Sequence, residues 1–178
     1  MFSRRIFLTL AAGSFLAACT QQVVTSEISE RLDIQDVRVS FTDAAEQGAS
    51  LKGVSYTSDY AKTLAEKLSV AGKQGDIPAR VLVSVDTMRV IAGNKQEFAE
   101  GTFRVERISD GMLLAGPSAF RSVTTPAATS GGLIGLAVGA VANGIVSQNE
   151  KVFRRSAASL GNLTAINLRS LIFGRTAF

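Results

Sequence analysis

The sequence contains no histidine and no tryptophan, and its single cysteine is Cys19. Without histidine, the chain lacks the commonest general base, proton shuttle and zinc ligand of proteins. A single thiol provides neither an intramolecular disulfide nor a cysteine-based metal site. Two tyrosines, with no interleaving of basic and aromatic side chains, give little basis for nucleic-acid binding. The sequence therefore predicts no catalytic residue, no metal site and no nucleic-acid partner.

Motifs of nucleophilic and phosphate chemistry are also missing, since there is no G-x-S-x-G, no P-loop and no Ser-x-x-Lys. The closest acidic pairs are Asp33 with Asp36 and Glu97 with Glu100. A cation site made of carboxylates alone needs several converging oxygens, so we expect both pairs on solvated loop or strand faces.

Another candidate is the dibasic pair Arg154-Arg155, near the start of the last predicted helix. Backbone N–H groups at a helix N-terminus favour anions, so phosphate is a possible ligand there. An exposed dibasic pair without a ligand is the plainer interpretation, and we favour it.

What the sequence does contain is a distinctive N-terminus. Arg4 and Arg5 precede a short apolar run, residues 6–18, which ends on Leu16-Ala17-Ala18 directly before the cysteine. A membrane-spanning helix needs about 20 apolar residues, so this run is too short to be one. A basic start, a short apolar region and small residues at its end are typical of a secretory signal peptide, which we assign to residues 1–18.

The four residues Leu16-Ala17-Ala18-Cys19 resemble the lipobox of bacterial lipoproteins, in which the cysteine thiol is acylated and the chain is cut before it. The resemblance implies that the mature chain begins at Cys19 and carries a covalent lipid there as its only bound group. One acyl chain gives marginal membrane binding, whereas two or three make the anchor effectively permanent. By the best-known sorting rule, Thr20 after the lipidated cysteine implies outer-membrane residence facing the periplasm.

Residues 3–8 also resemble the twin-arginine export motif, with Thr9 where lysine is usual. That route carries proteins that fold before export. A general secretory signal with two adjacent arginines explains the same residues. Both export routes stay open at this point.

Four later segments alternate apolar and polar side chains, as half-buried strands do. They cover residues 37–42, 79–91, 98–108 and 112–123. A shift of the alternation near Asp86 indicates a bulge or bend. Residues 92–96 and the pair Asp110-Gly111 are typical of hairpin turns. Pro117 favours an edge position for the last strand, because proline cannot donate a ladder hydrogen bond.

Two segments show helical spacing instead. Tyr60, Leu64 and Leu68 recur every four residues and predict a helix that Ser58 or Asp59 caps and Gly72 ends. A longer helix is predicted over about 149–174. Residues 42–57, between the first strand and the first helix, are predicted to be a loop.

This order predicts an α+β fold, with a small antiparallel sheet of about four strands and two helices on one of its faces. The single domain is assigned to residues 36–178, and residues 19–35 to the lipidated cysteine and a polar tether. The expected core consists of Leu64, Leu68, Val81, Val83, Val85, Phe103, Leu160 and Leu163.

The segment 130–147 is rich in glycine and apolar residues, with Gly131, Gly135 and Gly139 spaced by four. It resembles the glycine-zipper segments of some bacterial envelope proteins, and its apolar part is too short to span a bilayer. It is either a buried or flexible loop, a short helix that dips into the membrane or packs on its own copy, or a docking surface for another envelope protein.

The chain as a whole resembles small bacterial envelope lipoproteins, and its element order is similar to accessory lipoproteins of envelope transport and assembly systems. The resemblance implies a membrane-anchored, non-enzymatic interaction or accessory domain in the periplasm. Its expected partners are another envelope protein or a second copy of the chain. A lipid- or small-ligand-binding transport component, using the apolar face beside residues 131–146, is the alternative, and an enzyme comes third.

Overall fold

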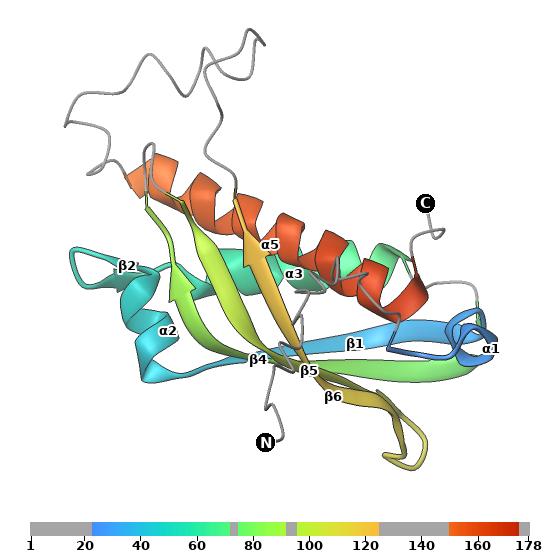
Figure 1. Cartoon of the computed structure of the whole chain (residues 1–178). Helices are drawn as coiled ribbons and strands as arrows, with labels where there is room; N and C mark the ends of the chain where they lie inside the picture. Colours follow the sequence, from blue (N-terminus) through green and yellow to red (C-terminus); the bar gives the residue numbers. More distant parts are fainter. Residues whose placement is uncertain (1–22, 72–74, 92–95, 125–149, 175–178) are drawn as a thin grey trace, which may run out of the picture.

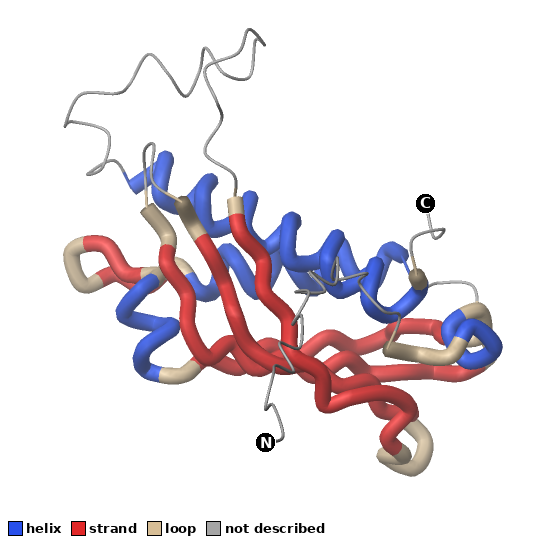
Figure 2. Tube along the Cα trace, in the orientation of Figure 1, coloured by secondary structure: helices blue, strands red, loops and turns tan. Residues whose placement is uncertain are grey.

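The structure is a computed structural model and describes residues 23–71, 75–91, 96–124 and 150–174. The fold is α+β, as predicted, with a four-stranded sheet and two long helices on one of its faces (Figures 1 and 2). The predicted signal peptide and the glycine-rich segment lie outside the described residues.

The sheet has the strand order β1-β4-β5-β6. β4 (Ile77–Arg89), β5 (Phe98–Arg107) and β6 (Leu113–Val123) pair antiparallel, as expected for consecutive hairpins. β1 (Leu32–Phe41) instead runs parallel to β4, so the prediction of an entirely antiparallel sheet is wrong for this pair. The reason is the helix between them, which carries the chain back to the end of the sheet where β1 began.

Local details of the strands follow the sequence. The register between β4 and β5 shifts between Val85 and Thr87, next to the predicted bulge. Gly111 turns the β5–β6 hairpin with a φ of 71°, a conformation that favours glycine. Pro117 lies in β6, an edge strand, where its missing N–H costs no ladder hydrogen bond.

The two long helices are α3 (Thr57–Ala71) and α5 (Glu150–Phe173). The predicted stripe of α3 is fully buried, with Tyr60, Leu64 and Leu68 each 0% exposed. α5 packs against α3 where it carries Gly161, and a Cβ atom there would lie 2.5 Å from the carbonyl oxygen of Tyr60. The absence of a side chain at residue 161 therefore sets how closely the helices approach.

Residues 42–57 form three short elements where a loop was predicted: α2 (Asp43–Gly48), β2 (Ser50–Leu51) and β3 (Val54–Ser55). The Thr42 hydroxyl accepts a hydrogen bond from the backbone N–H of Ala45 at 3.3 Å, which caps α2. Only Ala45 is buried within this helix. One buried alanine makes no apolar stripe, so hydrophobic spacing did not reveal the helix.

The described domain also begins earlier than residue 36. α1 (Ser26–Ser29) and the first residues of β1 occupy part of the predicted tether, and Val24, Leu32 and Ile34 are at most 2% exposed. The backbone N–H of Val23 donates to the carbonyl oxygen of Leu171 at 2.7 Å. Residues 23–35 therefore belong to the domain, and residues 19–22 of the predicted tether lie outside the described part.

Candidate functional site

The face of the sheet opposite the two long helices is open, since no described helix packs across its middle (Figure 1). Because side chains alternate along a strand, the outward positions of β1, β4, β5 and β6 come together here. These positions carry mostly polar and charged side chains, whereas the inward positions carry the core. The open face is the candidate functional site.

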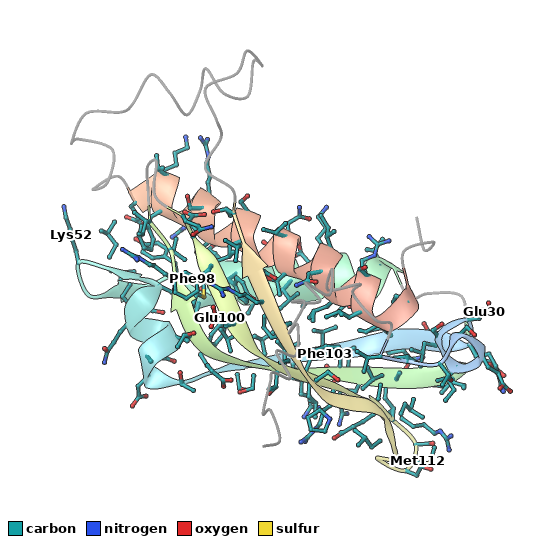
Figure 3. All side chains as sticks on the ribbon, in the orientation of Figure 1. Glu30, Lys52, Phe98, Glu100, Phe103 and Met112 are labelled. Atoms are coloured by element: carbon teal, nitrogen blue, oxygen red, sulfur yellow. The ribbon has the colours of Figure 1, made fainter. Side chains whose placement is uncertain are left out.

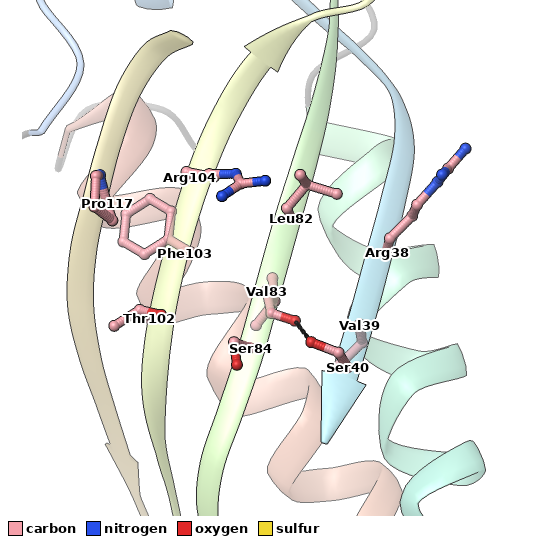
Figure 4. A pocket seen from close by; sticks show the side chains of 10 residues that line it. All are labelled: Arg38, Val39, Ser40, Leu82, Val83, Ser84, Thr102, Phe103, Arg104 and Pro117. Carbon is pink, nitrogen blue, oxygen red and sulfur yellow. Dashed lines mark hydrogen bonds between the residues drawn. The ribbon is translucent and has the colours of Figure 1, made fainter. Parts of the chain in front are cut away.

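A shallow depression of about 300 Å³ lies in the open face (Figure 4). Leu82 and Pro117 supply apolar surface, and Arg38 and Arg104 supply guanidinium groups. Three hydroxyl groups complete the polar lining, from Ser40, Ser84 and Thr102. All four strands of the sheet contribute to it, so the depression exists only in the folded sheet.

The charges around this depression pair with one another. Asp36 Oδ2 accepts from Arg38 Nε at 2.9 Å and from Arg80 Nε at 2.6 Å, and Arg104 Nε lies 2.7 Å from Glu106 Oε1. Partial burial raises the pKa of Asp36, but the hydrogen bonds from Arg80 and Arg38 outweigh it, so this pKa lies below its ordinary value. These charged side chains therefore nearly neutralise one another.

A second depression, of about 610 Å³, shares Thr102 with the first and continues along the same face. Glu100 and Arg121 line it and form an ion pair of 2.9 Å. The two depressions together make an elongated surface of apolar patches edged by exposed, paired charges.

The hydroxyl groups of Ser40 and Ser84 on the open face are not arranged for nucleophilic catalysis within the described residues. Ser40 Oγ donates to the backbone carbonyl of Val83 at 3.4 Å, and Ser84 Oγ donates to Asp86 at 3.4 Å. An activated nucleophile needs a base that a third group orients, and Asp86 is exposed with no such partner. Within the described ranges, no group of three histidine, cysteine or acidic side chains is placed to hold a metal ion. The arrangement is suited to hydrogen bonding and ion pairing.

The acidic pairs from the sequence are not brought together as sites. Asp33 accepts from Gln35 at 2.7 Å, while Asp36 holds two arginines and Glu100 pairs with Arg121. Glu97 contradicts the expectation of a solvated face, because it is only 7% exposed.

Glu97 joins three parts of the chain. Its backbone N–H donates to Thr124 Oγ1 at 3.0 Å, and its carboxylate accepts from the N–H of Ile91 at 3.4 Å. Burial raises the pKa of Glu97, and hydrogen bonds from Ser156 and Ile91 only partly oppose this. The residue therefore joins the ends of β4 and β6 to α5, and its burial disfavours the charged form of its carboxyl group.

Arg154 holds the start of α5 against α3. Its guanidinium lies 3.4 Å from Asp59 and 3.2 Å from Glu150, so both nearby carboxylates occupy it. Arg155 is exposed beside it. The geometry thus favours the plainer interpretation of the dibasic pair over a phosphate site.

Other predicted residues lie outside the described part of the chain: Arg4, Arg5, Leu16, Ala17, Ala18, Cys19, Gly131, Gly135 and Gly139. Sequence reasoning also missed the open-face depression. The sequence indicated it only through the polar positions that alternate with apolar ones along each strand. These show that Arg38 and Arg104 point outward, but not that they flank one depression.

No protein-family model and no curated protein matches this chain. Similar solved structures include an uncharacterized protein, 12% identical with a TM-score of 0.39, covering 78% of this chain and 92% of that chain. The PelC dodecamer from Paraburkholderia phytofirmans is 14% identical with a TM-score of 0.38, covering 77% and 88%. A protein from Caulobacter crescentus CB15, provisionally described as a lipoprotein, is 14% identical with a TM-score of 0.33, covering 75% and 88%. At these TM-scores the likeness carries no argument about function.

No helix within the described ranges combines the length with the apolar character that crossing a bilayer requires.

Proposed function

We propose that the protein is a lipid-anchored accessory protein of the bacterial cell envelope that binds a partner through the open face of its sheet and catalyses no reaction. The observation that carries the proposal is the contrast within one sheet. One face is covered by helices, whereas the other presents two adjoining depressions that are together lined by residues from every strand. The partner is an envelope protein or a second copy of the chain.

The chemistry of the open face suits protein recognition. Interfaces are enriched in arginine, and fully buried contacts at their centre supply most of the affinity. Leu82 and Pro117 offer such a centre, and Arg38 and Arg104 flank it. Because Arg38 and Arg104 are themselves more than half exposed, these arginines can turn to a partner's acceptors at small cost.

The open face is tested by site-specific photo-crosslinking in intact cells. A photoreactive residue at exposed Thr102 is expected to capture a discrete protein, either a second copy or another envelope protein. The matched control is Ser159, which is exposed on the opposite side, on α5. Equal capture from both positions, or from neither, would contradict the proposal.

The lipid anchor is tested separately at Cys19. Cys19→Ser should abolish incorporation of labelled fatty acid and leave precursor or unanchored protein, because the lipobox reading requires the thiol. Undiminished labelling in that variant would rule out the anchor. Outer-membrane residence rests on Thr20, and fractionation with inner-membrane markers would overturn that part alone.

A second candidate function is the binding of a lipid or small ligand in the first depression. Its volume of about 300 Å³ lies at the lower end of the usual range for ligand pockets. Mass spectrometry of the protein purified from membranes would show a non-covalent ligand in constant ratio. Loss of that ligand on Leu82→Arg, without loss of fold, would favour this function over a protein partner.

A further inference from the structure

The hairpin between β5 and β6 ends in an unusually apolar tip, which comprises residues 108–113 and is here called the hairpin tip. Ile108, Met112 and Leu113 are 37%, 46% and 49% exposed. They account for half of the six large hydrophobic side chains that are exposed in the described structure. Figures 1 and 3 show the hairpin projecting from the sheet, with Met112 at its end.

Scattered exposed hydrophobic residues are ordinary, but a contiguous group on a projecting element marks an interaction site. The hairpin of β2 and β3 provides a comparison. Its turn, which Figure 3 marks with Lys52, presents one exposed apolar side chain, that of Val54. The concentration of apolar surface is therefore a property of the β5–β6 hairpin and not of every turn in the domain.

Asp110, the charged residue of the hairpin tip, is paired with Arg107, which directly precedes the tip. Arg107 Nη1 lies 3.1 Å from Asp110 Oδ2, and Asp110 Oδ1 accepts from the N–H of Met112 at 3.1 Å. Backbone hydrogen bonds join Gly111 to Arg107 at 3.0 Å and Arg107 to Met112 at 2.8 Å. Because these groups already have hydrogen-bond partners, moving the tip out of bulk water would leave few of them without one.

The hairpin tip lies at the end of the molecule from which the N-terminal chain leaves. The N–H of Ile108 donates to Pro78 at 2.9 Å, and the N–H of the adjacent Ile77 donates to Arg31 at 2.8 Å. α1 and the C-terminal end of α5, which holds Val23, lie beside the start of β1 at the same end (Figure 1). Cys19 precedes Val23 by four residues, which span about 14 Å at most.

We propose that the hairpin tip enters the headgroup region of the bilayer that holds the lipid anchor, so that the domain stands on the membrane at two points. The inference rests on the lipid anchor proposed above. The short reach from Cys19 to Val23 keeps this end of the domain near the membrane surface, where the exposed apolar side chains of the tip partition favourably into the interface.

This orientation has a consequence for the rest of the molecule. Thr124 and Glu150, the described residues that flank the glycine-rich segment, lie beyond the other end of β5, beside Glu97 and at the start of α5. They are thus held away from the anchoring bilayer. The open face of the sheet rises between the two ends and stays accessible from the periplasm.

Depth-dependent fluorescence quenching tests the inference on the lipidated protein, purified and reconstituted in phosphatidylcholine vesicles. Cys19 is the only native cysteine, and acylation blocks it, so an environment-sensitive dye can be placed on a single introduced cysteine. Ser109→Cys labels the hairpin tip, Val54→Cys labels the β2–β3 turn, and Ser159→Cys labels the outer side of α5. Vesicles with and without a nitroxide near the headgroups then report proximity.

We expect about twofold quenching at residue 109 and little at residues 54 and 159, since interfacial segments lie about 5–10 Å into the headgroup boundary. Adding Ile108→Ser, Met112→Ser and Leu113→Ser to the residue 109 sample should remove that quenching while the thermal unfolding midpoint stays unchanged. Equal quenching at all three positions of a vesicle-bound protein would overturn the inference but leave the anchor. Failure to float with the vesicles would overturn the anchor, and the inference with it.

Discussion

The two faces of the sheet carry side chains from the same strands but differ in almost every property. On the helix side, Val81, Val83 and Val85 alternate along β4 and are at most 2% exposed. On the open side, Arg80, Leu82 and Ser84 occupy the intervening positions and are half-buried. Because strand side chains alternate with a period of two, one sequence supplies a core and a recognition surface at once. Substitutions on the two faces should therefore separate stability from binding.

The largest expected loss of stability comes from Gly161→Ala on the covered side. A Cβ atom there would lie 2.5 Å from the Tyr60 carbonyl oxygen, so α3 and α5 must move apart. We expect the free energy of unfolding to fall by about 3 kcal/mol, the upper end of the cost of overpacking. Chemical denaturation measures it.

The matched control for that prediction is Ser159→Ala, on the exposed side of the same helix. Alanine has the higher helix propensity, so this change should be neutral or slightly stabilising. If Gly161→Ala were equally harmless, the close approach of the helices would not determine the packing of the covered face.

A smaller loss in the free energy of unfolding is expected when the buried hydrogen bond between α3 and α5 is broken. Tyr60 donates to Thr164 Oγ1 at 3.1 Å, and Thr164 donates to the Leu160 carbonyl at 3.0 Å. Thr164→Val leaves the Tyr60 hydroxyl buried without an acceptor and should cost about 2 kcal/mol. Tyr60→Phe removes the donor instead and should cost only about 1 kcal/mol. Equal losses in denaturant titrations would contradict this asymmetry.

Glu97 makes stability depend on pH. Burial raises its pKa in the folded state above the ordinary value of 4.5, so the folded state favours the protonated carboxyl. The stabilisation from this group is present below pH 4.5 and is lost as pH rises through the raised pKa. Glu97→Gln should therefore raise the unfolding midpoint at neutral pH, and the difference from the parent should shrink on acidification. A constant difference across pH would argue against this assignment.

The smallest effect on stability is expected on the open face. Arg104 is half-exposed and pairs with Glu106 at 2.7 Å, and such surface pairs contribute little. Arg104→Ala should change the free energy of unfolding by at most about 0.5 kcal/mol. In the crosslinking experiment, however, it should reduce capture at Thr102. A large loss of stability would show that the open face belongs to the folding core.

Much of the fold was predictable because its main elements are long and strongly periodic. The alternation in β4 to β6 and the four-residue spacing of Tyr60, Leu64 and Leu68 identified three strands and a helix near their true bounds. Residues 23–35 were misassigned because α1 is only four residues long and its apolar side chains show no regular spacing among polar ones such as Glu27 and Glu30. The helix α2 was missed because it buries a single alanine.

Glu97 shows why the candidate site was harder to predict than the elements. A charged residue on a strand is ordinarily solvated, and nothing local signals burial. Its burial arises because Thr124 and Ser156, far along the chain, meet it at the end of the sheet. Conversely, the edge position of Pro117 was predictable from the sequence, because proline has no N–H to donate to a neighbouring strand.

The sequence alone determined the types of the long elements, the inward and outward phase of their strands and the resemblance to a lipoprotein signal, because each depends on neighbouring residues. Only the tertiary structure decided that β1 runs parallel to β4, that Arg38 and Arg104 flank one depression, and that the hairpin tip lies at the end where Val23 enters. These arrangements depend on contacts between residues distant in the chain. Local periodicity carries no information about such contacts, because it reports only how side chains are directed along a single helix or strand.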